Sequence, residues 1–443
     1  MEVRWDLNRL RNAISLVRHV VGALSLDRLS RDPDGLRRLQ EFRLRRLVAH
    51  AYARVPFYRR WFDDAGAHPD QIRTLDDLAR LPLLTKKLLR EVPSDDLLDR
   101  GARREECFLT ETSGSTGQPT RIYKDTRAIF SIAGWGSPMM IARWLGRPGW
   151  RMMTMLVRDE HSIETVMMRV LPRFMLRIRE ADALADPAEQ AARLNAFRPD
   201  LLVSYPSTLR NLALYARDRG LTLHRPQAII WSAEVLDPPT RALIESVFRS
   251  ELFAAYGSTE AGLMGLECVY HRGVHVISTR VIVEVLRDGA PAPPGEPGDV
   301  VVTDLTNFVF PIIRYAGMGD AARWSPARCP CGRALPLLEM IEGRRVDSFV
   351  LPDGRIIHPY TLTLAIQNVP GILQYQLVQE RPDRVRVLLA RIDTDGQSAA
   401  QAITVALGAI LGPQVSVEVQ PVPAIPLAPG ERIPRVVRSL VPH

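Results

Sequence analysis

Short apolar segments alternate with helical segments after Cys107, and this alternation restricts the possible fold more than any other feature. The segments RMMTMLV, LLVSYP, AIIWSAE and ELFAAYG are apolar on both faces, as expected for strands buried within a sheet. Between them, PAEQAARLNAF, STLRNLALYARDRG and DPPTRALIESVF have the pattern of helices. This order predicts a parallel α/β sheet.

Three further regions surround the predicted sheet. Residues 1–100 are predicted to be helical, with Thr85 as the N-cap of one helix. Residues 101–342 would form the core, which gains an antiparallel β subregion in HVISTRVIVEVLRDG and GDVVVTDL. Residues 343–443 begin at a linker-like stretch and would form a small, mobile α+β domain. The expected fold class is therefore α/β, with a large N-terminal domain and a small C-terminal one.

Composition excludes several classes of protein. The chain has 443 residues, enough for two or three domains, and its net charge is +8. Arginines are scattered over the whole length and only three lysines occur, so nucleic acid is not an expected partner. No segment is apolar enough to span a bilayer, so no membrane partner is expected and we expect a cytoplasmic protein. Homodimers are the commonest soluble assembly, and only this base rate suggests one here.

A loop rich in Ser, Thr and Gly follows the strand-like segment CFLTET. Such a loop can wrap backbone N–H groups and hydroxyls around phosphate oxygens, although the lysine of the G-x-x-x-x-G-K-[ST] phosphate loop is missing. A plain surface loop is the alternative, because Gly/Ser loops are common. The candidate phosphate ligands are Ser113, Gly114, Ser115, Thr116, Gly117 and Thr120.

A second candidate group directly follows the predicted strand ELFAA, and it consists of Tyr256, Gly257, Ser258, Thr259 and Glu260. In open α/β sheets, ligands bind at the carboxyl ends of strands. Tyr256 could stack on a base, Thr259 could bond a phosphate, and the Glu260 carboxylate could hold Mg²⁺. The structural alternative is a helix N-cap at Ser258 or Thr259, with Glu260 in the first turn.

A third candidate lies in IIRYAGMGD, which ends at Asp320. Its second half begins a degenerate G-x-G-x-x-A dinucleotide motif, GMGDAA. However, no long helix follows, because Pro326 and a cysteine turn come within ten residues. We therefore expect Asp320 to accept hydrogen bonds from two ribose hydroxyls instead.

Together these motifs resemble the adenylate-forming superfamily, and within it the phenylacetate–CoA ligase-like branch. The resemblance spans nearly the whole chain. RLRRLVAHAYARVPFYRRWFDDAG and LPLLTKK resemble the branch's N-terminal helices, TSGSTGQPT its phosphate loop and LLVSYPSTL and AIIWSAEVL its middle motifs. YGSTEAG resembles its adenine and magnesium motif, IIRYAGMGD its ribose motif and EGRRVDSFVLPDGR its hinge.

The resemblance implies ATP and Mg²⁺ as cofactors. A carboxylate oxygen would attack the α-phosphorus, pyrophosphate would leave, and a thiol such as that of coenzyme A would then attack the acyl-adenylate. It also implies that Ser232, Ala233 and Glu234 line the adenine, that Arg344 lies at the ribose or hinge, and that Asp347 belongs to the hinge.

The sequence departs from the family pattern in two places. The ribose motif has one residue more between Arg314 and Asp320 than the usual Arg-Tyr-x-x-Gly-Asp. The C-terminal catalytic lysine is missing, since no lysine follows Lys124, and Arg432 is the nearest cationic replacement. An arginine keeps the charge but lacks the compact ammonium geometry, so a decayed or repurposed enzyme is the alternative.

Cysteine and histidine spacing predicts a structural zinc site. Cys329 and Cys331 place two thiolates on one turn, and Cys268 lies upstream with His271 and His275 close behind. Three Cys and one His would form a closed tetrahedral site, with His275 favoured over His271 because of the family's Gly-apolar-His pattern. The alternative is three buried thiols without a metal.

The acyl pocket is the least constrained part of the prediction. Its candidates are chosen by position relative to the motifs, and each could equally be ordinary core. They are Trp135, Met139, Met140, Tyr205 and Trp231.

Three functions are compatible with these features. The first is an acid–CoA ligase. The second is a synthetase that passes the adenylate to an amine or a carrier-protein thiol, or an adenylyltransferase. The third is a non-catalytic nucleotide-binding protein.

Overall fold

The structure is a computed structural model of the chain. It describes residues 28–111, 120–135, 150–157, 161, 163, 165–166, 176–234, 236, 238–344, 349–357, 361–362, 365–366, 369, 372–392, 396–423, 425 and 437–441. Among these residues, no helix has both the length and the apolar character that crossing a membrane requires.

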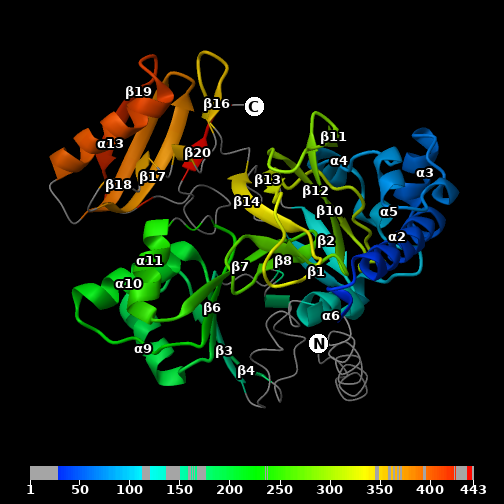
Figure 1. Ribbon diagram of the computed structural model, residues 1–443, viewed down its shortest axis with the longest axis horizontal. Coiled ribbons are helices and arrows are strands. Elements are labelled where there is room, and N and C mark those ends of the chain that lie inside the picture. The colour runs from blue at the N-terminus through cyan, green and yellow to red at the C-terminus, as the bar shows by residue number, and fades with distance from the viewer. Residues whose placement is uncertain are drawn as a thin grey trace.

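One large mixed sheet of twelve strands dominates the molecule (Figure 1). Its strand order is β11-β10-β12-β13-β14-β9-β8-β7-β6-β5-β3-β4. The neighbours β4, β3, β5, β6 and β7 run parallel, whereas the strands from β7 to β11 pair antiparallel. The predicted α/β fold class is confirmed, including the change from parallel to antiparallel strands.

The parallel half follows the predicted alternation. Helices α9, α10 and α11 pack with the apolar residues of these strands in one buried cluster, because the strands are apolar on both faces. The elements are β3 (Trp150–Leu156), β4 (Leu176–Asp182), α9 (Pro187–Phe197), β5 (Leu201–Ser204), α10 (Pro206–Asp218), β6 (Ala228–Trp231), α11 (Pro238–Phe248) and β7 (Glu251–Ser258).

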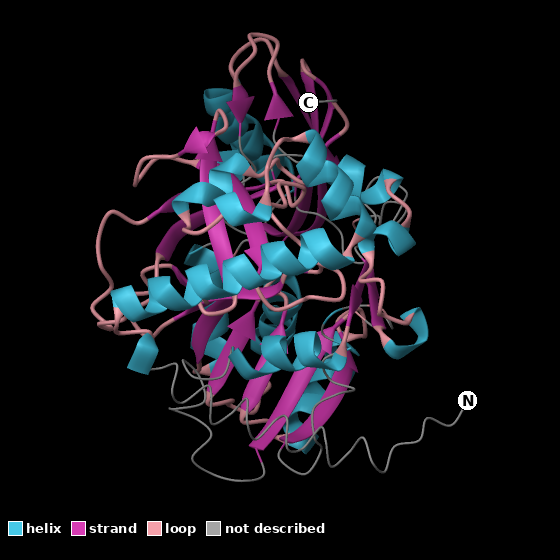
Figure 2. Ribbon diagram, turned by 90° about the vertical axis from the view of Figure 1, so that its right-hand side faces the viewer, coloured by secondary structure: helices cyan, strands magenta, loops and turns pink. Residues whose placement is uncertain are grey.

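The antiparallel half shares the largest buried cluster with the N-terminal helices. Figure 2 shows helices in front of strands on the side that carries this region. The strands are β8 (Gly262–Glu267), β9 (Val274–Val276), β10 (Val281–Arg287), β11 (Ala290–Pro291), β12 (Gly298–Asp304), β13 (Asp320–Trp324) and β14 (Leu337–Arg344).

The described N-terminal region is helical, as predicted, up to about residue 100. The Thr85 hydroxyl accepts a hydrogen bond from the Leu88 N–H and caps α4, which confirms the predicted N-cap. The elements are α2 (Pro33–Arg54), α3 (Pro56–Asp64), η1 (Pro69–Gln71), η2 (Asp76–Arg80), α4 (Lys86–Glu91), α5 (Ser94–Leu97) and η3 (Arg104–Glu106).

A short hairpin brackets the predicted phosphate loop. Strands β1 (Phe108–Glu111) and β2 (Arg121–Lys124) pair antiparallel, and α6 (Thr126–Trp135) follows directly. Most of the loop between the two strands, residues 112–119, lies outside the described residues. The hairpin therefore fixes where the loop leaves and re-enters the fold.

The C-terminal residues form a separate four-stranded sheet with its own apolar cluster, shown at the upper left of Figure 1. The strand order is β19-β18-β17-β20, with α13 packed against it. The elements are β15 (Phe349–Val350), β16 (Ile356–Ile357), β17 (Ile372–Arg381), β18 (Arg384–Ile392), α13 (Gly396–Leu411), β19 (Ser416–Pro421) and β20 (Val437–Ser439). The boundaries near residues 100 and 342 stay predictions.

Candidate active site

The predicted adenine and ribose motifs meet in space. The Tyr256 hydroxyl at the end of β7 donates a hydrogen bond of 2.9 Å to a carboxylate oxygen of Asp320, the first residue of β13. The Cα of Asp320 in turn pairs with that of Arg344 across β13 and β14. Residues that are 64 positions apart in sequence are therefore in direct contact.

The extra residue of the ribose motif is accommodated before Asp320. Gly319 adopts a left-handed φ of 74°, which costs glycine little, and Asp320 then begins the strand. Arg314 adopts a φ of 48°, and its guanidinium forms a two-point ion pair with Glu284 at 2.9 and 3.1 Å. Arg314 is therefore a structural residue, held by β10 rather than turned toward a ligand.

The segment after Tyr256 is a tight turn between β7 and β8. The Ser258 hydroxyl accepts a hydrogen bond of 3.1 Å from the Ala261 N–H, but β8 begins at Gly262, and no helix follows. The alternative of a helix N-cap is therefore wrong, because the chain reverses into an antiparallel strand. A Cβ on Gly257 would lie only 2.7 Å from the Gly262 carbonyl oxygen, so the turn requires glycine there.

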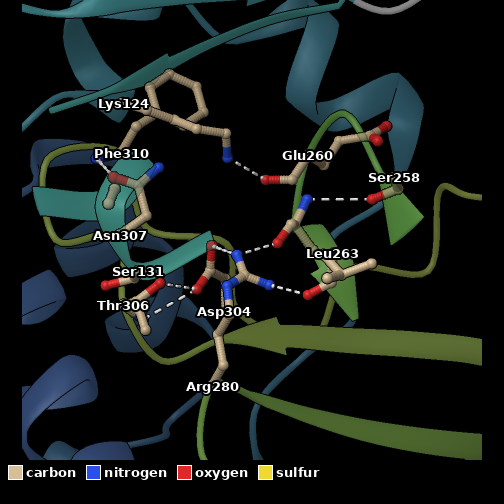
Figure 3. A network of polar contacts seen from close by, with 12 residues as sticks. Lys124, Ser131, Ser258, Glu260, Leu263, Arg280, Asp304, Thr306, Asn307 and Phe310 are labelled. Atoms are coloured by element: carbon tan, nitrogen blue, oxygen red, sulfur yellow. Dashed lines mark hydrogen bonds and ion pairs between the residues drawn. The ribbon is translucent and has the colours of Figure 1, made fainter. Parts of the chain in front are cut away.

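Glu260 lies in this turn and is 5% exposed. The Tyr315 hydroxyl donates a hydrogen bond of 2.7 Å to one of its carboxylate oxygens. Its backbone carbonyl accepts a hydrogen bond of 2.7 Å from the ammonium of Lys124, as Figure 3 shows. A carboxylate oxygen has two acceptor sites, so this carboxylate retains capacity for a cation.

Lys124 was not among the residues predicted from sequence. It is fully buried in β2, and burial lowers the pKa of its ammonium to about 8, while the charges of Asp304 and Glu260 act in the opposite direction. One signal could have found it: it is one of only three lysines in the chain and lies just after the predicted phosphate loop.

A buried ion pair supports the same turn from the other side (Figure 3). Arg280 and Asp304 are 0% and 1% exposed, and a guanidinium nitrogen lies 3.0 Å from a carboxylate oxygen. Arg280 also donates to the carbonyls of Ala261 and Leu263, on the two sides of Gly262. Sequence reasoning missed this pair, because nothing local marks an arginine as buried.

The middle motif residue Glu234 has a structural partner. Its carboxylate accepts hydrogen bonds of 2.8 and 2.7 Å from the backbone N–H and the hydroxyl of Ser207, in the first turn of α10. Burial raises the pKa of Glu234, against the effect of these bonds. The neighbouring Ala233 has a left-handed φ of 67°, uncommon for a residue with a Cβ, while Ser232 is half-buried beside it.

Two of the predicted acyl-pocket residues are described with their side chains. Trp231 ends β6 and packs between the two main apolar clusters. Its buried indole N–H has no hydrogen-bond partner among the described residues. Tyr205 is half-buried at the N-cap of α10. Buried N–H groups are almost always paired, so the Trp231 indole is a candidate donor to a ligand.

Other predicted residues fall partly or wholly outside the described part of the chain. Thr120 is described, and its hydroxyl accepts a hydrogen bond of 3.2 Å from Arg90. The backbones of Trp135 and Arg344 are described, but their side chains are not. The predicted residues that lie outside are Ser113, Gly114, Ser115, Thr116, Gly117, Met139, Met140, Asp347 and Arg432.

Four potential metal ligands gather at the end of β8. The Sγ atoms of Cys268, Cys329 and Cys331 and one ring nitrogen of His275 lie within 4.8 Å of one another. Two of the separations, Cys268–Cys329 and Cys331–His275, are 3.5 Å. A tetrahedron with Zn–S bonds of about 2.3 Å has edges of roughly 3.7 Å, so the donor set fits zinc.

His271 lies outside this cluster. Its ring nitrogens are 3.3 Å from Glu267 and 3.7 Å from Glu251, and the hydrogen bond that the imidazole donates to Glu267 raises the pKa of His271. Gly273 adopts a φ of 125° and approaches the backbone of Leu338 too closely for any Cβ. This close approach brings His275, rather than His271, to the three thiols.

Comparison with known proteins gives a consistent family. No protein-family model matches the chain. The chain is 29% identical over 371 residues to the phenylacetate-coenzyme A ligase of Thermus thermophilus, covering 78% of each chain. It is 25% identical over 383 residues to the ligase of the same name from Aromatoleum evansii, covering 82% of this chain and 83% of that protein.

A solved structure of 2-hydroxyisobutyryl-CoA ligase in the postadenylation state, in complex with R3-HIB-AMP, has a similar fold. The TM-score is 0.74 at 22% identity, over 86% of this chain and 85% of that one. The fold is therefore that of adenylate-forming CoA ligases. Within this class, the chain is similar in sequence to phenylacetate-coenzyme A ligases, the family that its motifs predict.

Proposed function

We propose that the chain adenylates a carboxylic acid with ATP, releases pyrophosphate and transfers the acyl group to coenzyme A. The contact between Tyr256 and Asp320 carries this proposal, because it joins the predicted adenine and ribose motifs. The similarity to phenylacetate-coenzyme A ligases over about four fifths of the chain supports it.

The chain's own residues provide a binding surface for the nucleotide. Asp320 would accept hydrogen bonds from the ribose, Tyr256 would stack on the adenine, and the backbone of residues 232–234 would line its edge. Arg344 pairs with Asp320 across two strands, which supports a role beside the ribose. The phosphates would be held by the loop of Ser113, Gly114, Ser115, Thr116 and Gly117, which Thr120 follows.

Glu260 is the proposed ligand of Mg²⁺, which would supply positive charge to the phosphate oxygens while the adenylyl group is transferred. Its carboxylate is held by Tyr315 and its carbonyl by Lys124, so the group is fixed before substrate arrives. Preorganised charge of this kind stabilises a transition state without reorganisation at the moment of reaction. Thr259, beside it, would donate to the phosphates.

We also propose a structural zinc ion at Cys268, His275, Cys329 and Cys331. It would join the end of β8 to the segment after β13 and so fix the magnesium contact relative to the ribose contact. Purified protein should hold one zinc per chain, and Cys329→Ser should lose it. Nucleotide affinity that stays unchanged after complete zinc removal would contradict this role.

Acid-dependent exchange of labelled pyrophosphate into ATP tests the proposed first step. A panel of aromatic and aliphatic acids should include at least one that supports exchange in the wild type, and Arg432→Lys tests whether the C-terminal cation takes part. If neither protein supports exchange with any acid although both bind ATP, the result would favour a non-catalytic nucleotide-binding protein instead.

The acceptor is tested separately. Coenzyme A, amines and a carrier-protein thiol are offered in turn to protein that supports exchange, and products are identified by mass. Coenzyme A is the proposed acceptor because the curated relatives are named as CoA ligases. An amide or a carrier-bound product without any CoA thioester would replace this proposal with the synthetase alternative.

Residues 343–443 are proposed to act as the mobile domain that separates the two steps, with Asp347 at the hinge. A cytoplasmic location and a homodimer also stay proposals. Fractionation of the native cell and sedimentation of the purified protein test them.

A further inference from the structure

A basic cavity lies outside the proposed nucleotide site, between α2, α6 and the segment that follows β12. Its volume is about 210 Å³. It is lined by Leu39, Phe42, Arg43, Arg46, Arg127, Ser131, Thr306 and Phe308. Three of these side chains are guanidinium groups, and none of the described lining residues is acidic.

The three arginines repel one another across this cavity. Arg43 donates to the carbonyl of Thr279, which fixes its position. Burial, followed by the charges of Arg127 and Arg46, lowers the pKa of Arg43 to about 10. Within the described residues, neither Arg46 nor Arg127 forms an ion pair. The cavity therefore gathers three guanidinium groups, and its described lining contains no carboxylate.

The acids nearest in sequence have contacts on their own helices. Glu41 forms an ion pair with Arg37 at 3.0 Å, and the Asp125 carboxylate accepts a hydrogen bond of 2.7 Å from the backbone N–H of Ala128. Arg37 lies on α2 and Ala128 on α6, the helices that carry the cavity arginines. Glu41 therefore stabilises α2, and Asp125 stabilises the start of α6. An anion from solution would offset the repulsion between the guanidinium groups.

The cavity walls restrict the size of that anion. The Arg46 guanidinium lies over the rings of Phe42 and Phe308, 5.6 and 5.9 Å from their centroids, which holds its planar fork in place. Pockets for drug-sized ligands have volumes of about 300–1,000 Å³, so this one suits a small anion or one charged group. Ser131 and Thr306 complete the wall, and both residues appear in Figure 3; their hydroxyls donate to the Arg127 carbonyl and to the Asp304 carboxylate, so the guanidinium groups are the donors left for an anion.

We propose that this cavity binds a tetrahedral oxyanion of the phosphate class through Arg43, Arg46 and Arg127. Guanidinium forks match phosphate oxygens in two-point hydrogen bonds, and two or more arginines can surround a dianion. The group can come from free inorganic phosphate or from a phosphate of coenzyme A. Only the second source rests on the proposed function.

Equilibrium dialysis with labelled inorganic phosphate tests the site without any reaction. The wild type should bind about one phosphate per chain with a Kd in the millimolar range or below, and the affinity should fall about tenfold in Arg46→Gln and in Arg127→Gln. Arg38→Gln is the matched control, because Arg38 lies on the same helix but its side chain is 72% exposed. It should bind phosphate as the wild type does.

Absence of saturable binding at about 10 mM phosphate would overturn the proposal, as would wild-type affinity in both cavity variants. Because dialysis needs no turnover, a negative result here is distinct from failure of the proposed ligase reaction.

The source of the phosphate is decided by comparing coenzyme A with dephospho-coenzyme A in the ligase assay. If the 3′-phosphate occupies the cavity, the KM for coenzyme A should be about tenfold lower than for dephospho-coenzyme A, and Arg46→Gln should abolish this difference. If the two KM values agree while labelled phosphate still binds in dialysis, the cavity serves a free anion. Both results support the site.

Discussion

Replacing Arg280 with methionine should destabilise the protein by about 3–5 kcal/mol, the usual cost of removing one partner of a buried ion pair. The ion pair with Asp304 is shielded from solvent, since the two side chains are 0% and 1% exposed. Arg280 also donates to the carbonyls of Ala261 and Leu263, and methionine can restore none of these bonds. Among the described residues, the Asp304 carboxylate would keep two hydrogen bonds, from the N–H and the hydroxyl of Thr306 at 2.9 and 2.6 Å, and the electrostatic attraction of Lys124.

Urea unfolding followed by tryptophan fluorescence measures this loss. Arg287→Met is the matched control, because Arg287 ends β10, the strand that directly follows Arg280, and forms an exposed pair with Glu296, which should contribute less than about 1 kcal/mol. The double variant Arg280→Met/Asp304→Leu should lose less stability than the sum of its two single variants, because no unpaired charge remains buried.

The same substitution should slow adenylation. Arg280 holds the two carbonyls on either side of Gly262, and this turn carries Glu260, so its loss should lower the maximal rate of pyrophosphate exchange and raise the concentration of Mg²⁺ required.

A loss of stability below about 1 kcal/mol in Arg280→Met would refute the reasoning, because it would show that the pair is solvated or replaceable.

Three other substitutions give separate tests. Lys124→Met should lower the maximal exchange rate by about one to two orders of magnitude, because Lys124 holds the Glu260 carbonyl. The exposed control Lys87→Met should keep the wild-type rate. Equal rates in the two variants would contradict a positioning role for Lys124. Trp231→Phe removes the buried indole N–H. It should raise the KM by about three- to tenfold for acids whose side chain carries a hydrogen-bond acceptor, and much less for acids with a purely hydrocarbon side chain. Equal effects across the acid panel would show that the indole only packs. Burial raises the pKa of Glu234 above 4.5, so between pH 4.5 and the raised pKa only the folded state keeps the proton, and the free energy of unfolding should fall as pH rises through this window. Urea midpoints measured across this window should fall less in Glu234→Gln, and an unchanged pH dependence in that variant would rule out the assignment.

Local patterns were sufficient for much of the fold. The predicted helix PAEQAARLNAF is α9 itself, and the four apolar runs are β3, β5, β6 and β7. These elements could be predicted because a strand buried on both faces and an amphipathic helix each leave a periodic record in the sequence. The family could be predicted because its motifs follow one another in a fixed order.

Local patterns failed where a residue's role depends on distant partners. The turn at Ser258 has the composition of a helix N-cap, yet Gly257 and Gly262 allow the chain to reverse into β8. Lys124 and Arg280 look like ordinary surface cations in sequence, yet both are fully buried. Their burial depends on charges that arrive from other strands.

The sequence by itself determined the order of strands and helices, the position of the nucleotide motifs and the family. These properties are encoded over short distances, in periodicity and in runs of a few residues. Only the tertiary structure decided which residues meet: His275 rather than His271 with the three thiols, Tyr256 with Asp320, and three arginines around one cavity. The physical reason is that hydrogen bonds, metal coordination and repulsion between charges act over a few ångströms in space, and sequence separation does not record that distance.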